Sequence, residues 1–102
     1  MKYLFIWLPI ILFVSFQTHA RKDCPEAKVV HVQIEGSVVL YRQEQAPWRR
    51  LGVLDDAGTK ERYSALLAAQ MAGRQVVVAY ARDSYDCSKS NYAESAYIVR
   101  TY

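Results

Sequence analysis

Apolar and polar residues alternate along the chain after residue 20, as they do in strands with one buried face. Residues 27–34, Ala-Lys-Val-Val-His-Val-Gln-Ile, predict a first strand, and residues 37–42 predict a second. The turn signal Glu35-Gly36 between them favours a hairpin. A third strand is predicted over residues 48–54, because Pro47 holds the preceding residue in an extended conformation. In the first strand we expect one face to consist of Val30, Val32 and Ile34, and the other of Val29, His31 and Gln33.

The apolar spacing after residue 59 becomes helical and predicts a helix over residues 60–72. Thr59 can cap the first turn of this helix. Gly73 stands just beyond the last turn, where a left-handed residue ends many helices. The residues expected to face the core are Leu66, Leu67 and Met71.

Two further strands are expected after the helix. Residues 76–80, Val-Val-Val-Ala-Tyr, indicate a strand buried on both faces and therefore a central one. A polar loop over residues 82–92 leads to a last strand over residues 96–102. The prediction is an α+β, mainly β chain of five strands, with one helix between the third and the fourth. This is the element order of the OB-fold, a small, partly open barrel, and other α+β arrangements share it.

The first 20 residues have the pattern of a secretory signal peptide. Lys2 precedes an uncharged, apolar run over residues 3–16, which is shorter than the roughly 20 residues that cross a bilayer. Thr18 and Ala20 place small side chains where a signal peptidase needs them. We expect cleavage after Ala20, a periplasmic or secreted protein, and no stable membrane anchor after cleavage. An uncleaved N-terminal anchor is the alternative, since Thr is less usual than Ala at its position.

Removal of residues 1–20 from the 102-residue chain leaves 82 residues, 21–102, which suits a single small domain. Both cysteines, Cys24 and Cys87, lie in this part. In an exported domain two cysteines near the two ends favour one disulfide, with two free thiols as the alternative. A metal site is disfavoured, because His31 is the only histidine after residue 20.

The charge pattern does not favour a polyanionic partner. Residues 1–20 hold one of the 13 basic residues and none of the 10 acidic ones, so the remainder has a net charge of +2. Arg49 and Arg50 follow Trp48, and OB-folds bind single-stranded nucleic acid with such clusters. Successive residues of a strand face opposite sides, however, and an exported protein rarely meets nucleic acid. We therefore expect no nucleic-acid partner.

One longer segment carries a family resemblance. Residues 63–80 run as an alanine-rich helix, a glycine, a basic residue and a valine-rich strand, between the early Cys24 and the late Cys87. This pattern resembles small exported bacterial proteins similar to the B subunit of subtilase cytotoxin, over about residues 48–102. The resemblance implies an OB-like fold. The toxin members of that family form rings that bind cell-surface glycans, but their sugar-contacting residues have no counterpart that can be matched here.

No recognisable motif assembles catalytic residues. His31 lies in an alternating strand, and neither Ser64 nor Ser84 stands in a His-Asp arrangement. The pair Asp55-Asp56 fits a loop before a helix better than acid–base chemistry. The glycines are too widely spaced for a phosphate-binding loop. We therefore expect a non-enzymatic protein with no catalytic residue, no metal and no cofactor.

Aromatic side chains suggest a binding function. All but one of the 8 tyrosines follow residue 20, as does Trp48, and such amphipathic rings suit recognition of protein or sugar surfaces. A disulfide at Cys87 would hold the loop over residues 82–92 ready for binding, although an ordinary solvated loop is the plainer alternative. We expect a module that binds a protein or a glycan through its loops; a toxin-like homo-oligomer and a small secreted inhibitor are the alternatives. The candidate binding residues are Trp48, Arg82, Tyr85, Lys89, Asn91 and Tyr92.

Overall fold

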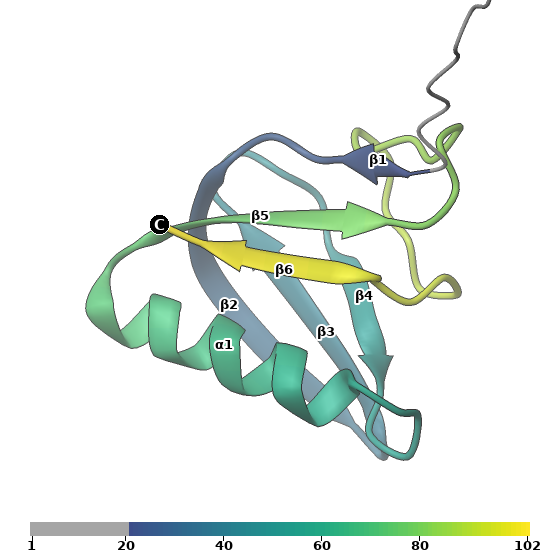
Figure 1. The fold of residues 1–102 in the computed structure, drawn as a ribbon, viewed down its shortest axis with the longest axis horizontal. Coiled ribbons are helices and arrows are strands. Elements are labelled where there is room, and N and C mark those ends of the chain that lie inside the picture. Colours follow the sequence, from purple (N-terminus) through teal and green to yellow (C-terminus); the bar gives the residue numbers. More distant parts are fainter. Residues whose placement is uncertain (1–20) are drawn as a thin grey trace, which may run out of the picture.

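The computed structural model describes residues 21–102, and the signal peptide expected over residues 1–20 lies outside them. The described part is mainly β, with one open antiparallel sheet of six strands, one helix and one disulfide (Figure 1). The expected helix and strands all occur, within about two residues of their predicted bounds. The elements are β1 (Lys22–Asp23), β2 (Ala27–Glu35), β3 (Val38–Gln43), β4 (Arg49–Val53), α1 (Thr59–Ala72), β5 (Gln75–Tyr80) and β6 (Ile98–Thr101).

β5 is the central strand, as its run of valines predicts. β1 and the start of β2 pair with it, and β6 pairs with it as well, so that β1 and β6 flank it in Figure 1. β2 then bends away from β5, and its later residues pair with β3, which in turn pairs with β4. α1 lies across the sheet and contacts β2, β4, β5 and β6. The bend in β2 therefore joins the two halves of the sheet around one core.

The sixth strand is β1, which the sequence did not predict, so the expected number of five strands is corrected. β1 pairs with Ala79 and Tyr80 of β5. Cys24 extends this pairing, because its backbone N–H donates to the carbonyl oxygen of Val78 at 3.0 Å. A charged strand of two residues carries no hydrophobic alternation, and pattern analysis therefore cannot find it.

A β-bulge in β2 overturns the expected division of its two faces. The register with β3 shifts between Val29 and His31. Val29 is buried and Val32 packs against the core, whereas Val30 and Ile34 are 37% and 45% exposed. Strict alternation would place Val29 and Val32 on opposite faces, and the residue inserted by the bulge brings them to the same one.

α1 packs on the sheet through Leu66 and Ala69, which are both buried, while Leu67 is half-buried. The expectation that Met71 faces the core is wrong, because Met71 is 87% exposed. Met71 follows Leu66 by five positions, and at 3.6 residues per turn this places it about 140° around the helix axis. The small Ala69 takes the core-facing position instead, which lets the helix lie close to the strands.

Glycines set both ends of α1. Gly73 is left-handed, with φ of 68°, and confirms the predicted helix end; the next N–H, of Arg74, donates to Ala69 O at 2.9 Å. At the start, left-handed Gly58 is the N-cap residue, with φ of 86° and no side-chain capping bond. The expectation that Thr59 caps the helix is therefore wrong: Thr59 is its first residue and is completely buried.

The core lies between β5, α1 and the strands from β2 to β4. The predicted disulfide between Cys24 and Cys87 is confirmed, with Cα atoms 5.6 Å apart and a sequence separation of 63 residues. Cys24 is buried and belongs to the core cluster, so the bridge fastens the loop over residues 82–92 to the core. The largest fully buried side chains of the cluster are Tyr41, Tyr80, Leu51 and Leu66. Within residues 21–102, no helix has the length and apolarity needed to cross a membrane.

Candidate functional site

An open groove with aromatic walls lies where β2, β3 and the start of β4 meet the loop after Cys87. It has a volume of about 220 Å³. We name it the aromatic groove and define it by its lining residues, Gln33, Glu35, Leu40, Trp48 and Tyr92. It combines two of the sequence-predicted binding residues, Trp48 and Tyr92, with three that the sequence did not single out.

Strand geometry supplies the floor and the polar side of the groove. Gln33 of β2 lies opposite Leu40 of β3 in the sheet register. Leu40 is buried, so it forms the apolar floor. Gln33 Nε2 donates to Glu35 Oε2 at 2.6 Å, which fixes an amide and a carboxylate side by side along β2. This pair offers hydrogen-bond acceptors next to an apolar surface.

Trp48 is held at the groove by contacts on two sides. Its ring stacks on the ring of His31, with centroids 5.8 Å apart and an angle of 18° between the planes. Its carbonyl oxygen accepts the backbone N–H of Asn91 at 3.0 Å. Trp48 is half-buried, so one part of the indole packs while the rest lines the groove.

Tyr92 also lines the groove, and it belongs to a loop that its neighbours order. The Asn91 side chain accepts the N–H groups of Ala93 and Glu94 at 3.0 and 2.8 Å, and its Nδ2 donates to Glu94 O at 2.7 Å. Arg50 Nη1 donates to Tyr92 O at 3.4 Å, so β4 holds the loop too. The Tyr92 side chain remains 57% exposed. The residues from Asn91 to Glu94 therefore present this ring from a fixed backbone.

The other predicted binding residues lie elsewhere. Arg82 Nη2 donates to Glu94 Oε1 at 2.6 Å in an exposed ion pair. Lys89 is exposed and does not line the groove, and Asn91 orders the loop rather than lining it. Tyr85 is buried in the core, where its ring stacks on Tyr80 with centroids 3.9 Å apart. The structure thus brings together Trp48 and Tyr92, with Asn91 bonded next to them, and leaves Arg82, Tyr85 and Lys89 outside the groove.

A pair of buried tyrosines bonds to the backbone of β4. Tyr80 donates its hydroxyl proton to Arg50 O at 2.9 Å, so the hydroxyl of Tyr41, also 2.9 Å away, donates to Tyr80. Burial raises the pKa of Tyr41 to about 12 and raises the pKa of both Tyr80 and Tyr85. These phenols therefore stay neutral near neutral pH. The hydroxyls of Tyr41 and Tyr80 act as hydrogen-bonding supports, whereas the Tyr85 hydroxyl is buried without a partner.

The residues considered for catalysis or metal binding are dispersed. His31 is exposed and stacked on Trp48, and Ser64 is exposed on α1. Asp55 and Asp56 are exposed in the turn before α1, where Asp56 O accepts the N–H of Thr59 at 3.2 Å. Residues 21–102 contain no group of three His, Cys, Asp or Glu side chains that could hold a metal ion. The groove itself offers apolar contact and hydrogen bonds.

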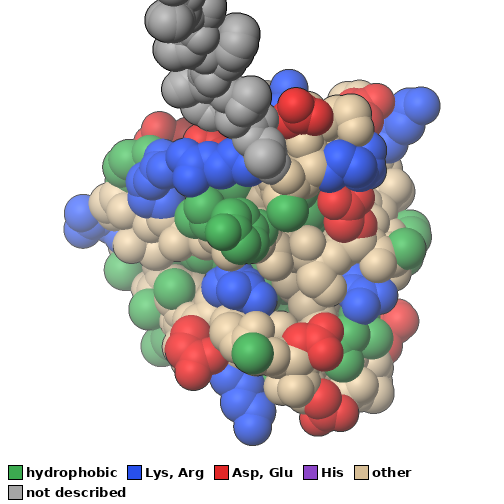
Figure 2. All heavy atoms as spheres, turned by 45° about the vertical axis from the view of Figure 1, so that its right-hand side comes forward, with side chains coloured by type: hydrophobic (Ala, Val, Ile, Leu, Met, Phe, Trp, Pro, Cys, Tyr) green, Lys and Arg blue, Asp and Glu red, His purple; other side chains and the backbone are tan. Residues whose placement is uncertain are grey.

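Surface charge around these features is mixed. Figure 2 shows Lys and Arg side chains interspersed with Asp and Glu side chains over the face it presents. Arg49 is buried whereas Arg50 is half-exposed, so the two successive arginines do not form one basic patch. A polyanion needs a continuous basic surface, and these two residues do not contribute one.

Comparison with known proteins gives no identity: no protein-family model, no curated protein and no solved structure matches the chain.

Proposed function

We propose that the chain is a small, exported, non-enzymatic binding module that recognises a glycan or a protein surface through the aromatic groove. The observation that carries this proposal is the convergence of Trp48 and Tyr92, 44 positions apart in sequence, over the buried Leu40. Hydrogen bonds hold the backbone of both residues, and the Trp48 ring also stacks on His31, so little backbone entropy is lost when a ligand is bound. A groove with two aromatic side chains and a short row of polar groups suits recognition rather than chemistry.

A glycan fits the groove better than a flat protein surface does. A sugar ring has an apolar C–H face that packs on aromatic rings, and its hydroxyl groups donate to acceptors such as Glu35 and Gln33 Oε1. The polar pair along β2 and the rings of Trp48 and Tyr92 line the same groove. The groove is small and open, which suits one or two sugar residues at the end of a chain.

We also propose that the open sheet curves into an OB-like barrel. Strand pairing leaves the sheet open, but two backbone bonds link the segment before β6 to β4 and to the residue before it: Ala96 N–H to Leu51 O at 2.9 Å, and Asn91 N–H to Trp48 O at 3.0 Å. An OB-fold is a small, partly open barrel. These bonds support partial closure, with the aromatic groove on the outside of the barrel.

Export of the mature chain is part of the same proposal. The disulfide supports it, because such bridges persist mainly in oxidising compartments. Intact-mass measurement of protein from the extracytoplasmic fraction is expected to give a chain that begins at Arg21 and lacks two thiol hydrogens. Recovery of the full-length, reduced chain from the cytoplasm alone would contradict export.

A glycan array with the exported protein tests the groove. Trp48→Ala and Tyr92→Ala are each expected to weaken binding at least about tenfold, since an aromatic anchor of this kind contributes on the order of 2 kcal/mol. Tyr97→Ala is the matched control, because Tyr97 is 58% exposed, as Tyr92 is 57%, and does not line the groove. Equal losses in Tyr92→Ala and Tyr97→Ala would refute the site, and a pull-down that yields protein without any array signal would assign a protein ligand.

A further inference from the structure

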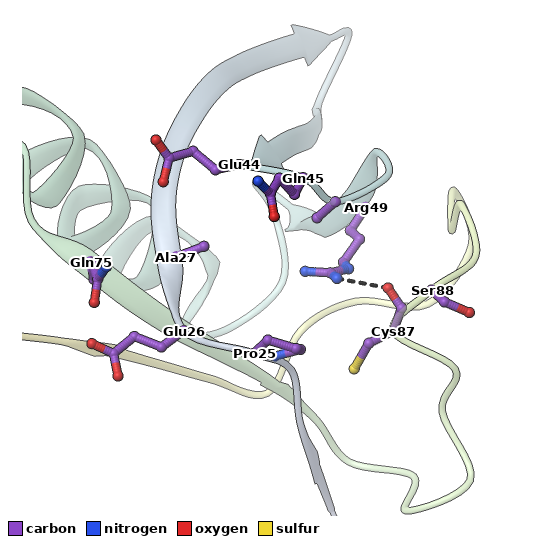
Figure 3. A pocket seen from close by; sticks show the side chains of 10 residues that line it. Pro25, Glu26, Ala27, Glu44, Gln45, Arg49, Gln75, Cys87 and Ser88 are labelled. Atoms are coloured by element: carbon purple, nitrogen blue, oxygen red, sulfur yellow. Dashed lines mark hydrogen bonds between the residues drawn. The ribbon is translucent and has the colours of Figure 1, made fainter.

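A second pocket lies beside the disulfide, and none of the groove residues lines it. Its volume of about 450 Å³ falls in the range of small-molecule sites. Figure 3 shows Arg49 reaching into it from β4, between Ser88 on one side and Glu26 and Glu44 on the other. We name it the Arg49 pocket and define it by Pro25, Glu26, Glu44, Arg49, Cys87 and Ser88.

Arg49 carries a buried positive charge that no carboxylate of residues 21–102 balances. Arg49 is 2% exposed, and the ion pairs within the described residues are Arg21–Asp23 and Arg82–Glu94. Its Nε–H is buried without an acceptor. A guanidinium keeps its charge at any physiological pH, and a buried charge without a counter-ion is costly. An anionic group bound at Arg49 would remove that cost.

Neutral acceptors hold the guanidinium in a fixed orientation. Nη1 of Arg49 donates to Gln43 Oε1 at 3.0 Å, and Nη2 donates to Cys87 O at 2.7 Å (Figure 3). Gln43 is itself fixed, because its Nε2 donates to Ala27 O at 3.0 Å and to Val76 O at 2.9 Å. A guanidinium held in this way is preorganised to receive a carboxylate through its remaining N–H groups.

The opposite side of the pocket carries the opposite charge. Glu26 and Glu44 line this side and are exposed, with carboxylates that extend away from Arg49 in Figure 3, and their charge would repel a purely anionic ligand. We propose that the Arg49 pocket binds a zwitterion whose carboxylate reaches Arg49 and whose separate cationic group lies against Glu26 and Glu44. A free basic amino acid and the C-terminal basic residue of a peptide share this chemistry. The proposal is independent of ligand binding at the aromatic groove.

Titration of the exported protein with defined small molecules, followed by the amide NMR signals of Ala27 and Ser88, tests the ligand class. L-lysine and L-arginine are expected to give saturable shifts. Lysinamide, which lacks the carboxylate, and norleucine, which lacks the side-chain cation, are each expected to bind at least about tenfold more weakly, since each loses a charge-assisted hydrogen bond. Nα-acetyl-lysine separates the two sources: tighter binding than lysine assigns a peptide C-terminus, and weaker binding assigns the free amino acid.

Variants distinguish binding in the Arg49 pocket from a general effect of surface charge on the ligand. Arg49→Gln is expected to abolish the response to L-lysine. Because Arg49 also holds the loop at Cys87, the decisive variant is the double change Glu26→Gln and Glu44→Gln, which alters exposed side chains only. It is expected to weaken L-lysine about tenfold or more and to leave the weak binding of norleucine unchanged. Asp55→Asn, an exposed carboxylate outside the pocket, is the matched control. The absence of saturable shifts with L-lysine and L-arginine, or equal binding of lysinamide, would overturn the proposal.

Discussion

Gly52 of β4 marks the place where a single residue decides how closely α1 approaches the sheet. A Cβ atom on Gly52 would lie 2.7 Å from Thr59 Oγ1 and 3.0 Å from Thr59 Cγ2. Thr59 is completely buried, so its side chain has no room to turn away. The start of the helix therefore rests on a strand position where any side chain crowds Thr59.

Gly52→Ala is expected to lower the free energy of unfolding by about 1–3 kcal/mol, because the added methyl group overpacks this contact. Urea unfolding of the two proteins measures the difference. In a Thr59→Ala background the two clashing side-chain atoms are gone, so the same change is expected to cost clearly less. An equal cost in both backgrounds would mean that the contact with Thr59 is not its cause.

The buried tyrosines make the folded protein less stable at high pH. Burial raises the pKa of Tyr41 from 10.0 in the unfolded chain to about 12 in the folded one. Between these values the unfolded chain has lost the proton that the folded chain keeps, so stability falls as the pH rises, by up to about 1.4 kcal/mol per pH unit for one such group. Below pH 10 the full stability is present.

Urea unfolding at about pH 8 and about pH 11 measures this effect. The free energy of unfolding is expected to be lower at about pH 11, because the pKa of Tyr41 is raised in the folded chain. Tyr41→Phe removes one of the groups and is expected to reduce the loss of stability between the two conditions. Tyr97→Phe changes an exposed ring and is expected to leave that loss as it is in the unmodified protein. A stability that does not change over this range would contradict neutral, buried phenols in the core.

At the scale of elements, periodicity predicted most of the fold, and its errors arise where pairing between distant segments decides the structure. A helix over residues 60–72 and a central strand over residues 76–80 were predictable, because long runs of apolar residues carry strong signals. The two faces of β2 were not predictable, since the bulge between Val29 and His31 depends on pairing with β3. The strand β1 was not predictable either, because it forms by pairing with β5 next to the disulfide.

The site shows the same division between local pattern and long-range packing. Trp48 and Tyr92 were predicted as binding residues from their chemistry, but only the register and the bond from Asn91 to Trp48 bring them together. Gln33 was not among the predicted binding residues. The alternation of the strand, which puts Gln33 on an exposed face, was the available signal for it. Tyr85 resembles Tyr92 in sequence context and is buried, because stacking on Tyr80 is a tertiary contact.

α1 offers a direct test of which face supports the fold. Leu66→Ala removes a fully buried side chain and is expected to cost about 2–5 kcal/mol of stability, seen as a lower Tm. Met71→Ala is the matched control on the same helix, because Met71 is 87% exposed and its truncation leaves the core intact. If both changes lowered the Tm equally, the orientation of the helix would be wrong.

At the scale of the whole molecule, the segment from residue 81 to residue 97 connects the core to the aromatic groove. The disulfide holds it at Cys87, the N–H of Asn91 bonds to Trp48 O, and the N–H of Ala96 bonds to Leu51 O. Arg49 adds a fourth contact by donating to Cys87 O at 2.7 Å. Stability and binding are therefore coupled through this one irregular segment.

The double change Cys24→Ser and Cys87→Ser tests that coupling. A bridge with a sequence separation of 63 residues restricts the unfolded chain, and its removal is expected to cost about 4 kcal/mol in the chain-entropy model. Urea unfolding measures this loss. Because the same bridge fastens the loop that presents Tyr92, ligand binding at the groove is expected to weaken even at temperatures where circular dichroism still reports a folded sheet. Unchanged binding by a clearly destabilised variant would mean that the bonds of Asn91 and Ala96 hold the groove without help from the disulfide, and that the bridge serves stability alone.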